Sequence, residues 1–209
     1  MKKIKLKKKN KSNKWLLRHL NDEYLLKAKL NGYRSRSAFK LIQINKKFNF
    51  FFKDANVIDL GAAPGGWSQV ANELVKPSGK VLSFDKLVIE PIDGIKFIDL
   101  DLNNIDEVER EVKEYFGKKV DIILSDMAPN TTGHKNTDHT RIISLAELAI
   151  NLTQNNLKKG GFFVCKIFQG GAQGELLLLL KNHFQNIKYY KPNASRQEST
   201  ETYLCGIKK

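Results

Sequence analysis

The chain has 209 residues, of which 41% are hydrophobic, and this suits one globular domain whose core needs no disulfide or metal. Its 36 Lys and Arg against 22 Asp and Glu give a formal charge of +14, which favours a polyanionic partner such as nucleic acid. No run of 18 apolar residues and no apolar leader occurs, which argues against a membrane protein. We expect a cytoplasmic monomer, with a mitochondrial address as the alternative.

The N-terminal segment is basic. Residues 1–14 contain eight lysines and no acidic residue, a composition typical of a disordered tail. We expect this tail to add phosphate contacts, and a merely solubilising arm is the alternative. Residues 15–209 should form the single domain. Within it, residues 15–31 read as irregular, and residues 34–48 predict an amphipathic helix that begins among basic residues.

From Asn56 onward, short apolar runs alternate with longer segments of helical periodicity. This alternation predicts right-handed crossovers and a parallel sheet covered on both faces, which is an α/β fold. The last two apolar runs have no helix between them, so they should form an antiparallel pair at one edge. We expect strands at residues 56–60, 80–85, 95–98, 120–126, 160–168, 186–190 and 202–207, and helices near residues 66–75, 104–116, 138–157 and 174–184.

A loop of small residues follows the first predicted strand. Asp59 to Trp67 reads Asp-Leu-Gly-Ala-Ala-Pro-Gly-Gly-Trp. Gly and Ala let the backbone approach a ligand closely, and the helix that follows offers free N–H groups. The dinucleotide fingerprint Gly-x-Gly-x-x-Gly is not present, which counts against an NAD-dependent oxidoreductase. The loop therefore predicts a ligand site of another kind.

Acidic residues follow the next two strands. Asp85 ends the second strand, where a carboxylate can accept hydrogen bonds from ribose hydroxyls. Asp101 follows the third strand and could accept from an adenine amino group. Ligands in open α/β sheets bind beyond the carboxyl ends of the strands. Together with the loop, these two residues predict a site for a cofactor that contains a nucleoside.

A lysine stands inside the most apolar of the later strands. Lys166 lies between Cys165 and Ile167, and an ammonium group in such surroundings requires a partner or an exposed edge. Asp126 ends the neighbouring strand and is the natural partner. Both cysteines, Cys165 and Cys205, lie in apolar runs, so we expect free buried thiols and no metal site.

These blocks together resemble the FtsJ/RrmJ family of ribosomal RNA 2′-O-methyltransferases. The resemblance covers nearly the whole chain after the tail, with all blocks in the family's order. It rests on Trp15-Leu16, residues 32–41 (Gly-Tyr-Arg-Ser-Arg-Ser-Ala-Phe-Lys-Leu), 59–69, 125–130, 166–170 (Lys-Ile-Phe-Gln-Gly), and Lys191-Pro192 through Ser195-Arg196 to Tyr203. It implies a class I S-adenosylmethionine-dependent methyltransferase fold, with a seven-stranded, mostly parallel sheet whose last strand is antiparallel.

The resemblance also implies roles for particular residues. The cofactor, S-adenosylmethionine, is expected to contact Gly65, Trp67, Asp85, Asp101 and Asp126, and the small-residue loop adds Gly61 and Gly66 as positions of close approach. The catalytic set is expected to be Lys40, Asp126, Lys166 and Glu201, in which Lys166 is the base for the 2′-hydroxyl. One departure is that Asp101 lies in Asp-Leu-Asp-Leu where relatives tend to show Gly-Asp-Phe. Asp99 is therefore a rival for the adenine contact.

The expected substrate is a uridine ribose in large-subunit (23S) ribosomal RNA, methylated in support of ribosome assembly. Arg34, Arg36 and Lys40 should contact this RNA, because they flank the expected site and phosphate contacts position a substrate without reading its sequence. The alternatives are a tRNA or an mRNA cap as the acceptor. An NAD-dependent oxidoreductase and a non-enzymatic assembly factor are the rivals from other classes of protein.

Two glutamates precede the final strand and compete for one place in the catalytic set. Glu201 and Tyr203 share one face of that strand by alternation, whereas Glu198 falls in the loop. Family spacing, with an acid two residues before the tyrosine, also selects Glu201. We therefore expect Glu201 to face the lysines.

Overall fold

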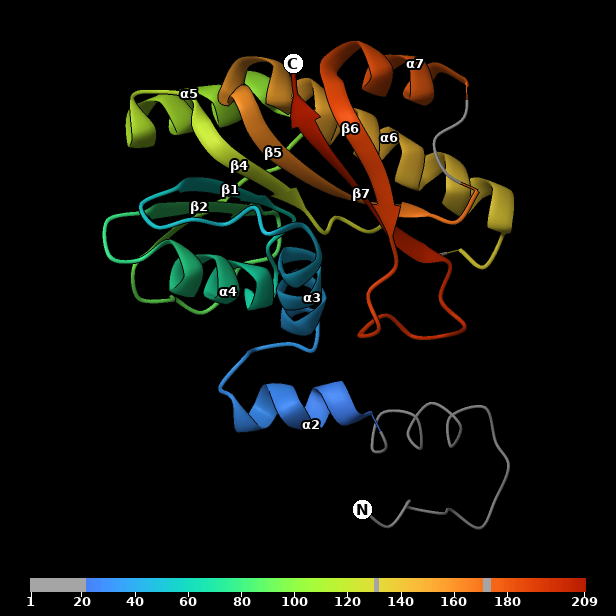
Figure 1. Cartoon of the computed structure of the whole chain (residues 1–209), viewed down its shortest axis with the longest axis horizontal. Coiled ribbons are helices and arrows are strands. Elements are labelled where there is room, and N and C mark those ends of the chain that lie inside the picture. The colour runs from blue at the N-terminus through green and yellow to red at the C-terminus, as the bar shows by residue number, and fades with distance from the viewer. Residues whose placement is uncertain (1–21, 130–131, 171–173) are drawn as a thin grey trace.

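The computed structural model describes residues 22–129, 132–170 and 174–209. In this part of the chain, seven strands form one sheet in the order β3-β2-β1-β4-β5-β7-β6 (Figure 1). The strands are β1 (Asn56–Leu60), β2 (Lys80–Asp85), β3 (Ile95–Asp99), β4 (Val120–Ser125), β5 (Leu157–Phe168), β6 (Phe184–Tyr190) and β7 (Glu201–Lys208). The expected α/β fold is confirmed.

Six strands run in the same direction, and the last strand, β7, runs opposite to them. β1 pairs in parallel with β2 and β4, β2 pairs with β3, and β4 pairs with β5. β7 lies between β5 and β6 and is antiparallel to both. The expected antiparallel pair at one edge is present, with β6 as the outermost strand.

The chain reverses its winding between β1 and β4, the two strands at the switch point of the sheet. From β1 it moves outward to β2 and β3, then returns to β4 on the other side. Crevices at such a point, beyond the carboxyl ends of the strands, are where ligands bind in open α/β sheets. The topology thus places the residues that follow β1 and β4 beside one another.

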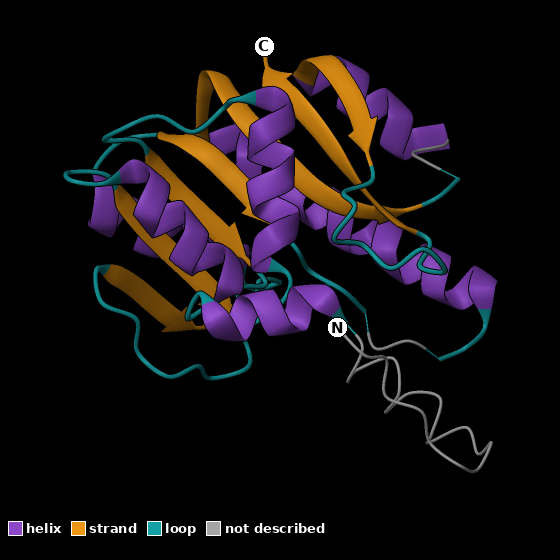
Figure 2. Cartoon of the chain, turned by 60° about the horizontal axis from the view of Figure 1, so that its bottom comes forward, coloured by secondary structure: helices purple, strands orange, loops and turns teal. Residues whose placement is uncertain are grey.

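Helices cover both faces of the sheet (Figure 2). On one face, α3 (Ala38–Phe48) and α4 (Gly66–Val75) bury apolar side chains such as Leu41 and Val70 against Val57 and Ile122. On the other face, α5 (Ile105–Phe116), α6 (Lys135–Asn156) and α7 (Gly174–His183) pack against Ile58, Ile123 and their neighbours. Every residue of β1 is buried, including the polar residues Asn56 and Asp59, as expected for a central strand covered on both faces.

Two expectations about the N-terminal region were wrong. Residues 23–30 form a helix, α2 (Glu23–Leu30), where we expected irregular structure. The sequence feature that marks α2 is its N-terminal capping residue, and not a stripe of apolar residues. The Asp22 carboxylate accepts hydrogen bonds from the backbone N–H groups of Tyr24 and Leu25. The helix expected over residues 34–48 begins only at Ala38, because residues 34–37 form turns. The expected tail at residues 1–14 lies outside the described residues.

None of the helices described by the structure is long and apolar enough to cross a membrane. Cys165 and Cys205 are both buried free thiols, as expected. Burial raises the pKa of the Cys165 thiol to about 12, so it stays protonated.

Candidate active site

The catalytic candidates meet where β4, β5 and β7 run side by side. Asp126 follows β4, whose Ser125 is paired with Cys165 of β5. Lys166 is directly opposite Tyr203 of β7 in the antiparallel pairing. Three strands that are distant in sequence therefore deliver a carboxylate, an ammonium and a phenol to one place.

Lys166 and Asp126 form a buried ion pair, as expected. The Lys166 Nζ lies 2.7 Å from Asp126 Oδ1, and it also donates a hydrogen bond of 2.6 Å to the Asp126 carbonyl oxygen. The Lys166 side chain is 8% exposed. A lysine buried among apolar residues is tolerated only with such partners, and here one residue supplies both.

Tyr203 completes the environment of Asp126. The Tyr203 hydroxyl donates a hydrogen bond of 2.7 Å to Asp126 Oδ1. Burial raises the pKa of Asp126, but the charges of Lys166 and Lys40 and the hydrogen bonds from Lys166 and Tyr203 outweigh it and hold the pKa below its usual range. Burial, together with the nearby Asp126 and Glu201 charges, raises the pKa of Tyr203 well above its ordinary value. Asp126 is therefore an anion, and Tyr203 is a neutral donor.

The second ion pair joins residues from opposite ends of the chain. α3 carries Lys40, whose Nζ lies 2.7 Å from Glu201 Oε1 and 2.9 Å from Glu201 Oε2. The same ammonium lies 5.9 Å from the centre of the Tyr203 ring. The two ion pairs, Lys166–Asp126 and Lys40–Glu201, thus flank one tyrosine. The structure brings together all four residues of the expected catalytic set.

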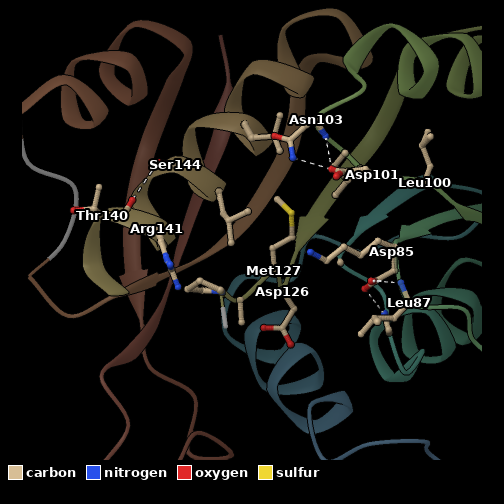
Figure 3. Close-up of a pocket in the computed structure, with 18 residues that line it drawn as sticks. Asp85, Leu87, Leu100, Asp101, Asn103, Asp126, Met127, Thr140, Arg141 and Ser144 are labelled. Atoms are coloured by element: carbon tan, nitrogen blue, oxygen red, sulfur yellow. Dashed lines mark hydrogen bonds between the residues drawn. The ribbon is translucent and has the colours of Figure 1, made fainter. Parts of the chain in front are cut away.

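A cavity of about 510 Å³ adjoins this cluster and includes Asp126 in its wall (Figure 3). Its volume lies in the range typical of small-molecule sites. Asp85 and Asp101 lie on one side, and Thr140, Arg141 and Ser144 of α6 lie on the other. The wall also contains the apolar side chains of Leu87, Leu100, Leu102, Met127, Leu145 and Leu148.

Asp85 and Asp101 are fixed by backbone donors. Asp85 accepts hydrogen bonds of 2.9 Å from the N–H groups of Ala63 and Leu87, one at each oxygen. Asp101 Oδ1 accepts from the backbone and side-chain nitrogens of Asn103, at 3.0 and 2.8 Å. These bonds hold the pKa of Asp101 below its usual range. Both carboxylates retain lone pairs for a ligand, since a carboxylate can accept about four hydrogen bonds.

Asp99 and Asp101, the two candidates for the adenine contact, differ in their position relative to the cavity. Asp99 is exposed at the end of β3 and is not among the residues that line the cavity, whereas Asp101 is. The geometry therefore favours Asp101 for a contact with the base of a nucleoside.

Of the expected loop residues, Gly61 alone lines the cavity. A Cβ atom on Gly61 would come within 2.6 Å of Met127 Cγ, and the φ angle of +76° is itself unfavourable for other residues. Gly61 therefore lets the loop after β1 lie directly against the segment after β4.

Gly65, Gly66 and Trp67 are not among the residues that line the cavity, and their contact with the cofactor stays a prediction. A side chain on Gly66 would collide with the Ser35 hydroxyl, and Trp67 is 2% exposed. The Trp67 indole N–H donates a hydrogen bond of 2.9 Å to the Ser37 carbonyl oxygen. These three residues hold the turns before α3 against α4, which places Lys40.

The two arginines expected to bind RNA are occupied by protein partners. Arg34 donates hydrogen bonds to the carbonyl oxygens of Pro64, Glu90 and Pro91. Arg36 forms an ion pair with Asp22 and donates to the Ala194 carbonyl oxygen. Both guanidinium groups therefore brace the N-terminal segment, which sequence position alone could not reveal.

Several site residues escaped sequence reasoning. Tyr203 appeared only as a strand residue, and Met127, Asn103 and Arg141 were not singled out, although all three line the cavity. Asn103 could have been found from its spacing, because a residue two positions after an aspartate commonly donates to that carboxylate. Among the described residues, no group of His, Cys, Asp and Glu could hold a metal ion.

Comparison with known proteins places this site in context. A family model described as FtsJ-like methyltransferase matches residues 33–209. The chain is 48% identical over 203 residues to "Ribosomal RNA large subunit methyltransferase E" of Rickettsia akari (strain Hartford), covering 95% of this chain and 89% of that protein. It is 51% identical over 193 residues to a protein of the same name from Acidiphilium cryptum (strain JF-5), covering 92% and 84%.

Solved structures agree with the fold. A crystal structure titled as a ribosomal RNA methyltransferase from Plasmodium falciparum superposes with a TM-score of 0.72 at 33% identity, covering 84% of this chain and 98% of that one. Fibrillarin from Aeropyrum pernix, solved with bound S-adenosyl-L-methionine, gives a TM-score of 0.56 at 14% identity and covers 85% and 76%. The second likeness concerns the fold alone.

Proposed function

The chain belongs to the FtsJ-like methyltransferase family, and from this premise we propose that it transfers a methyl group from S-adenosylmethionine to the 2′-hydroxyl of a uridine ribose in large-subunit (23S) ribosomal RNA. The observation that carries this proposal is the presence of two largely buried ion pairs, Lys166–Asp126 and Lys40–Glu201, beside a nucleoside-sized cavity whose wall includes Asp126. The names of the curated relatives point to large-subunit ribosomal RNA as the substrate.

The cavity fits the proposed cofactor. Asp85 offers carboxylate oxygens to a ribose diol, and Asp101 offers them to an exocyclic amine, while Leu102, Met127 and their apolar neighbours can enclose a purine ring. The close approach of Gly61 to Met127 leaves backbone groups at the wall for the amino-acid part. When bound, S-adenosylmethionine supplies an electrophilic methyl group.

The residues of the cluster then have distinct tasks. A ribose hydroxyl is a poor nucleophile at neutral pH, so transfer requires a base and an aligned acceptor. Lys166, in its neutral form, takes the proton from the 2′-hydroxyl. Asp126, held anionic by its partners, orients Lys166 and stabilises the ammonium that results. No metal ion is required for these steps.

The Lys40–Glu201 pair positions the acceptor. Lys40 is 8% exposed as a residue and sits on the helix that follows the basic turns. Its ammonium can contact a ribose or phosphate oxygen, and Glu201 balances its charge and fixes its direction. In this scheme Lys40 contacts the RNA, whereas Arg34 and Arg36, the other two residues expected to do so, are bound within the protein.

The wider partner is ribosomal RNA, which we propose is met within the large subunit in the cytoplasm by a monomer. The charge of +14 favours such a polyanion. Residues 15–209 would form the methyltransferase domain, and the lysines of residues 1–14 would add phosphate contacts. A tRNA or a cap remains the alternative acceptor, distinguished by the assay below.

The test is transfer of a labelled methyl group from S-adenosylmethionine to large subunits that lack the modification, to free 23S RNA, to tRNA and to capped RNA. We expect label in large-subunit RNA, recovered after complete digestion as a 2′-O-methyluridine. The Lys166→Ala protein serves as the control that retains the cavity. Label on a base, or on tRNA or the cap in preference to ribosomal RNA, would refute the proposal.

A further inference from the structure

One buried residue in the loop before β7 is held by α3 and the turn that precedes it. Ala194 is fully buried, and its backbone N–H donates a hydrogen bond of 2.9 Å to Gln43 Oε1. Its carbonyl oxygen accepts a hydrogen bond from the Arg36 guanidinium. A buried peptide requires partners for both of its polar groups, and here both partners come from the same N-terminal region.

The two side chains flank a catalytic residue. Gln43 lies three residues after Lys40, and residues at this spacing are neighbours on one face of a helix. Arg36 lies four residues before Lys40, in the turn that leads into α3. Lys40 pairs with Glu201, which follows the loop that contains Ala194. The two residues that hold Ala194 therefore flank Lys40 along the chain.

Internal hydrogen bonds connect the held residue to Glu201. The N–H of Ser195 donates to the Pro192 carbonyl at 2.9 Å. Lys191 donates 2.6 Å to the Ser199 carbonyl, and the Ser199 hydroxyl accepts 3.2 Å from the N–H of Glu201. Because these hydrogen bonds connect residues 191–201, we expect a shift at Ala194 to reach Glu201.

Residues at the start of helix α2 contact the side chains of Arg36 and Gln43. The Asp22 carboxylate pairs with Arg36 and lies 3.9 Å from the Arg196 guanidinium. The side-chain N–H of Gln43 donates a hydrogen bond of 3.2 Å to the Tyr24 hydroxyl. Arg36 and Gln43 thus each contact the start of α2 and also bind Ala194 in the loop before β7.

We propose that Arg36 and Gln43 are positioning residues that fix the loop of residues 191–200 on α3 and thereby set the geometry of the Lys40–Glu201 ion pair. The inference rests on the proposed function and deepens it. It gives Arg36 a role inside the protein in place of the RNA contact that we expected from the sequence. It also assigns a role to α2: this helix restrains Arg36 and Gln43, although it lies away from the reacting atoms.

The first test compares Gln43→Leu, which removes both hydrogen bonds but retains bulk, with Gln43→Glu, which keeps an acceptor for the N–H of Ala194. We expect kcat to fall about tenfold or more in Gln43→Leu, since a displacement of about 1 Å can cost on the order of a hundredfold. The KM for S-adenosylmethionine should be unchanged. Gln43→Glu should stay within threefold of the wild type. A Gln43→Leu protein with normal kcat would overturn the proposal.

The second test asks whether Gln43 acts through Glu201. In a Glu201→Gln background, Gln43→Leu should lower the single-turnover rate by less than twofold further, because the geometry that it protects is already lost. Multiplicative losses would overturn the proposal. Amide hydrogen exchange tests the proposal without measuring methyl transfer. Gln43→Leu should increase the exchange rates of both the Ala194 and the Glu201 amides. Protection that persists at Glu201 would also overturn it.

The third test separates positioning from RNA binding at Arg36. Arg36→Gln should lower kcat while leaving the slope of RNA affinity against salt concentration unchanged, because no phosphate contact is lost. A flatter slope would show that Arg36 binds phosphate and would overturn its assignment. The outcomes are distinct from failure of the proposed function, which would appear as a wild-type protein that does not methylate ribosomal RNA while the exchange behaviour persists.

Discussion

Tyr203 and Lys166 share one acceptor: the Tyr203 hydroxyl and the Lys166 ammonium each lie 2.7 Å from Asp126 Oδ1. A single carboxylate oxygen therefore joins the phenol and the proposed base. Because Tyr203 is fully buried and packs 5.5 Å from the Trp67 ring, centre to centre, its hydroxyl has a fixed direction. Removing that donor should change the chemistry of Asp126 more than the packing.

The first prediction concerns this hydroxyl. Tyr203→Phe keeps the ring but withdraws one of the hydrogen bonds that hold the pKa of Asp126 low, so this pKa should rise. The unfolding free energy should fall by about 1 kcal/mol, the usual loss for one hydrogen bond. We expect a several-fold lower single-turnover rate with S-adenosylmethionine affinity retained. Calorimetry and rapid-quench kinetics would measure both, and an unchanged rate would show that the hydroxyl is dispensable.

The second prediction concerns the base. Lys166→Ala should reduce methyl transfer by roughly 10²–10⁴, the usual contribution of a positioned base, while S-adenosylmethionine still binds. Lys159→Ala, at an exposed lysine of the same strand, is the matched control and should transfer normally. Isothermal titration and single-turnover assays separate the two effects. Near-normal turnover by Lys166→Ala would rule out Lys166 as the base.

The third prediction separates the two glutamates before β7. Glu201→Ala leaves Lys40 without its partner and should lower the transfer rate measurably, though less than Lys166→Ala does. Glu198 is exposed in the loop, so Glu198→Ala should change the rate and the stability little. Single-turnover rates of the two variants decide the matter. Equal rates, or a larger loss at Glu198, would contradict the assignment.

The fourth prediction distinguishes Asp99 and Asp101, the two candidates for the proposed adenine contact. Asp101→Ala should weaken S-adenosylmethionine binding about tenfold, because it removes an acceptor at the cavity wall. Asp99→Ala removes an exposed carboxylate outside the wall and should leave the dissociation constant within twofold of the wild type. Titration calorimetry with S-adenosylmethionine measures both. The reverse order of losses would transfer the contact to Asp99.

The fifth prediction follows from the buried carboxyl of Asp59. Burial raises its pKa to about 7, reinforced by the Asp126 and Asp85 charges and opposed by a hydrogen bond from Ser68. The folded protein therefore holds a proton between about pH 4 and 7 that the unfolded chain releases, so this group makes stability fall as pH rises through that window. Above about pH 7 the cost is complete, on the order of a few kcal/mol.

Asp59→Asn removes the titration but keeps an oxygen for the Ser68 hydroxyl, which lies 2.6 Å from Asp59 Oδ2. Its melting temperature relative to the wild type should therefore be higher at pH 8 than at pH 5. Thermal unfolding at the two pH values measures this difference. If the difference in melting temperature between the two proteins were the same at both pH values, Asp59 would not titrate in this range.

Local pattern was sufficient for much of the molecule. Leu60, Asp85 and Ser125 end strands where apolar runs stop, and parallel strands bring their carboxyl ends to one edge, so Asp85 and Asp126 could be placed near each other without coordinates. α2 was missed because its evidence is one capping residue, Asp22, and its apolar residues form no clear stripe. Motif order, read as a family resemblance, supplied the identities of the proposed catalytic residues.

What the sequence by itself determined is the succession of strands and helices along the chain from β1 onward, and the residues that follow each strand, because periodicity is a property of neighbouring residues. Only the tertiary structure decided which of the two lysines pairs with Glu201, namely Lys40, and that Arg34 and Arg36 are occupied by protein partners. It likewise decided that Asp101, not Asp99, faces the cavity. Whether a charged side chain is free depends on which distant carbonyl or carboxylate packing brings within reach, and no local pattern records that distance.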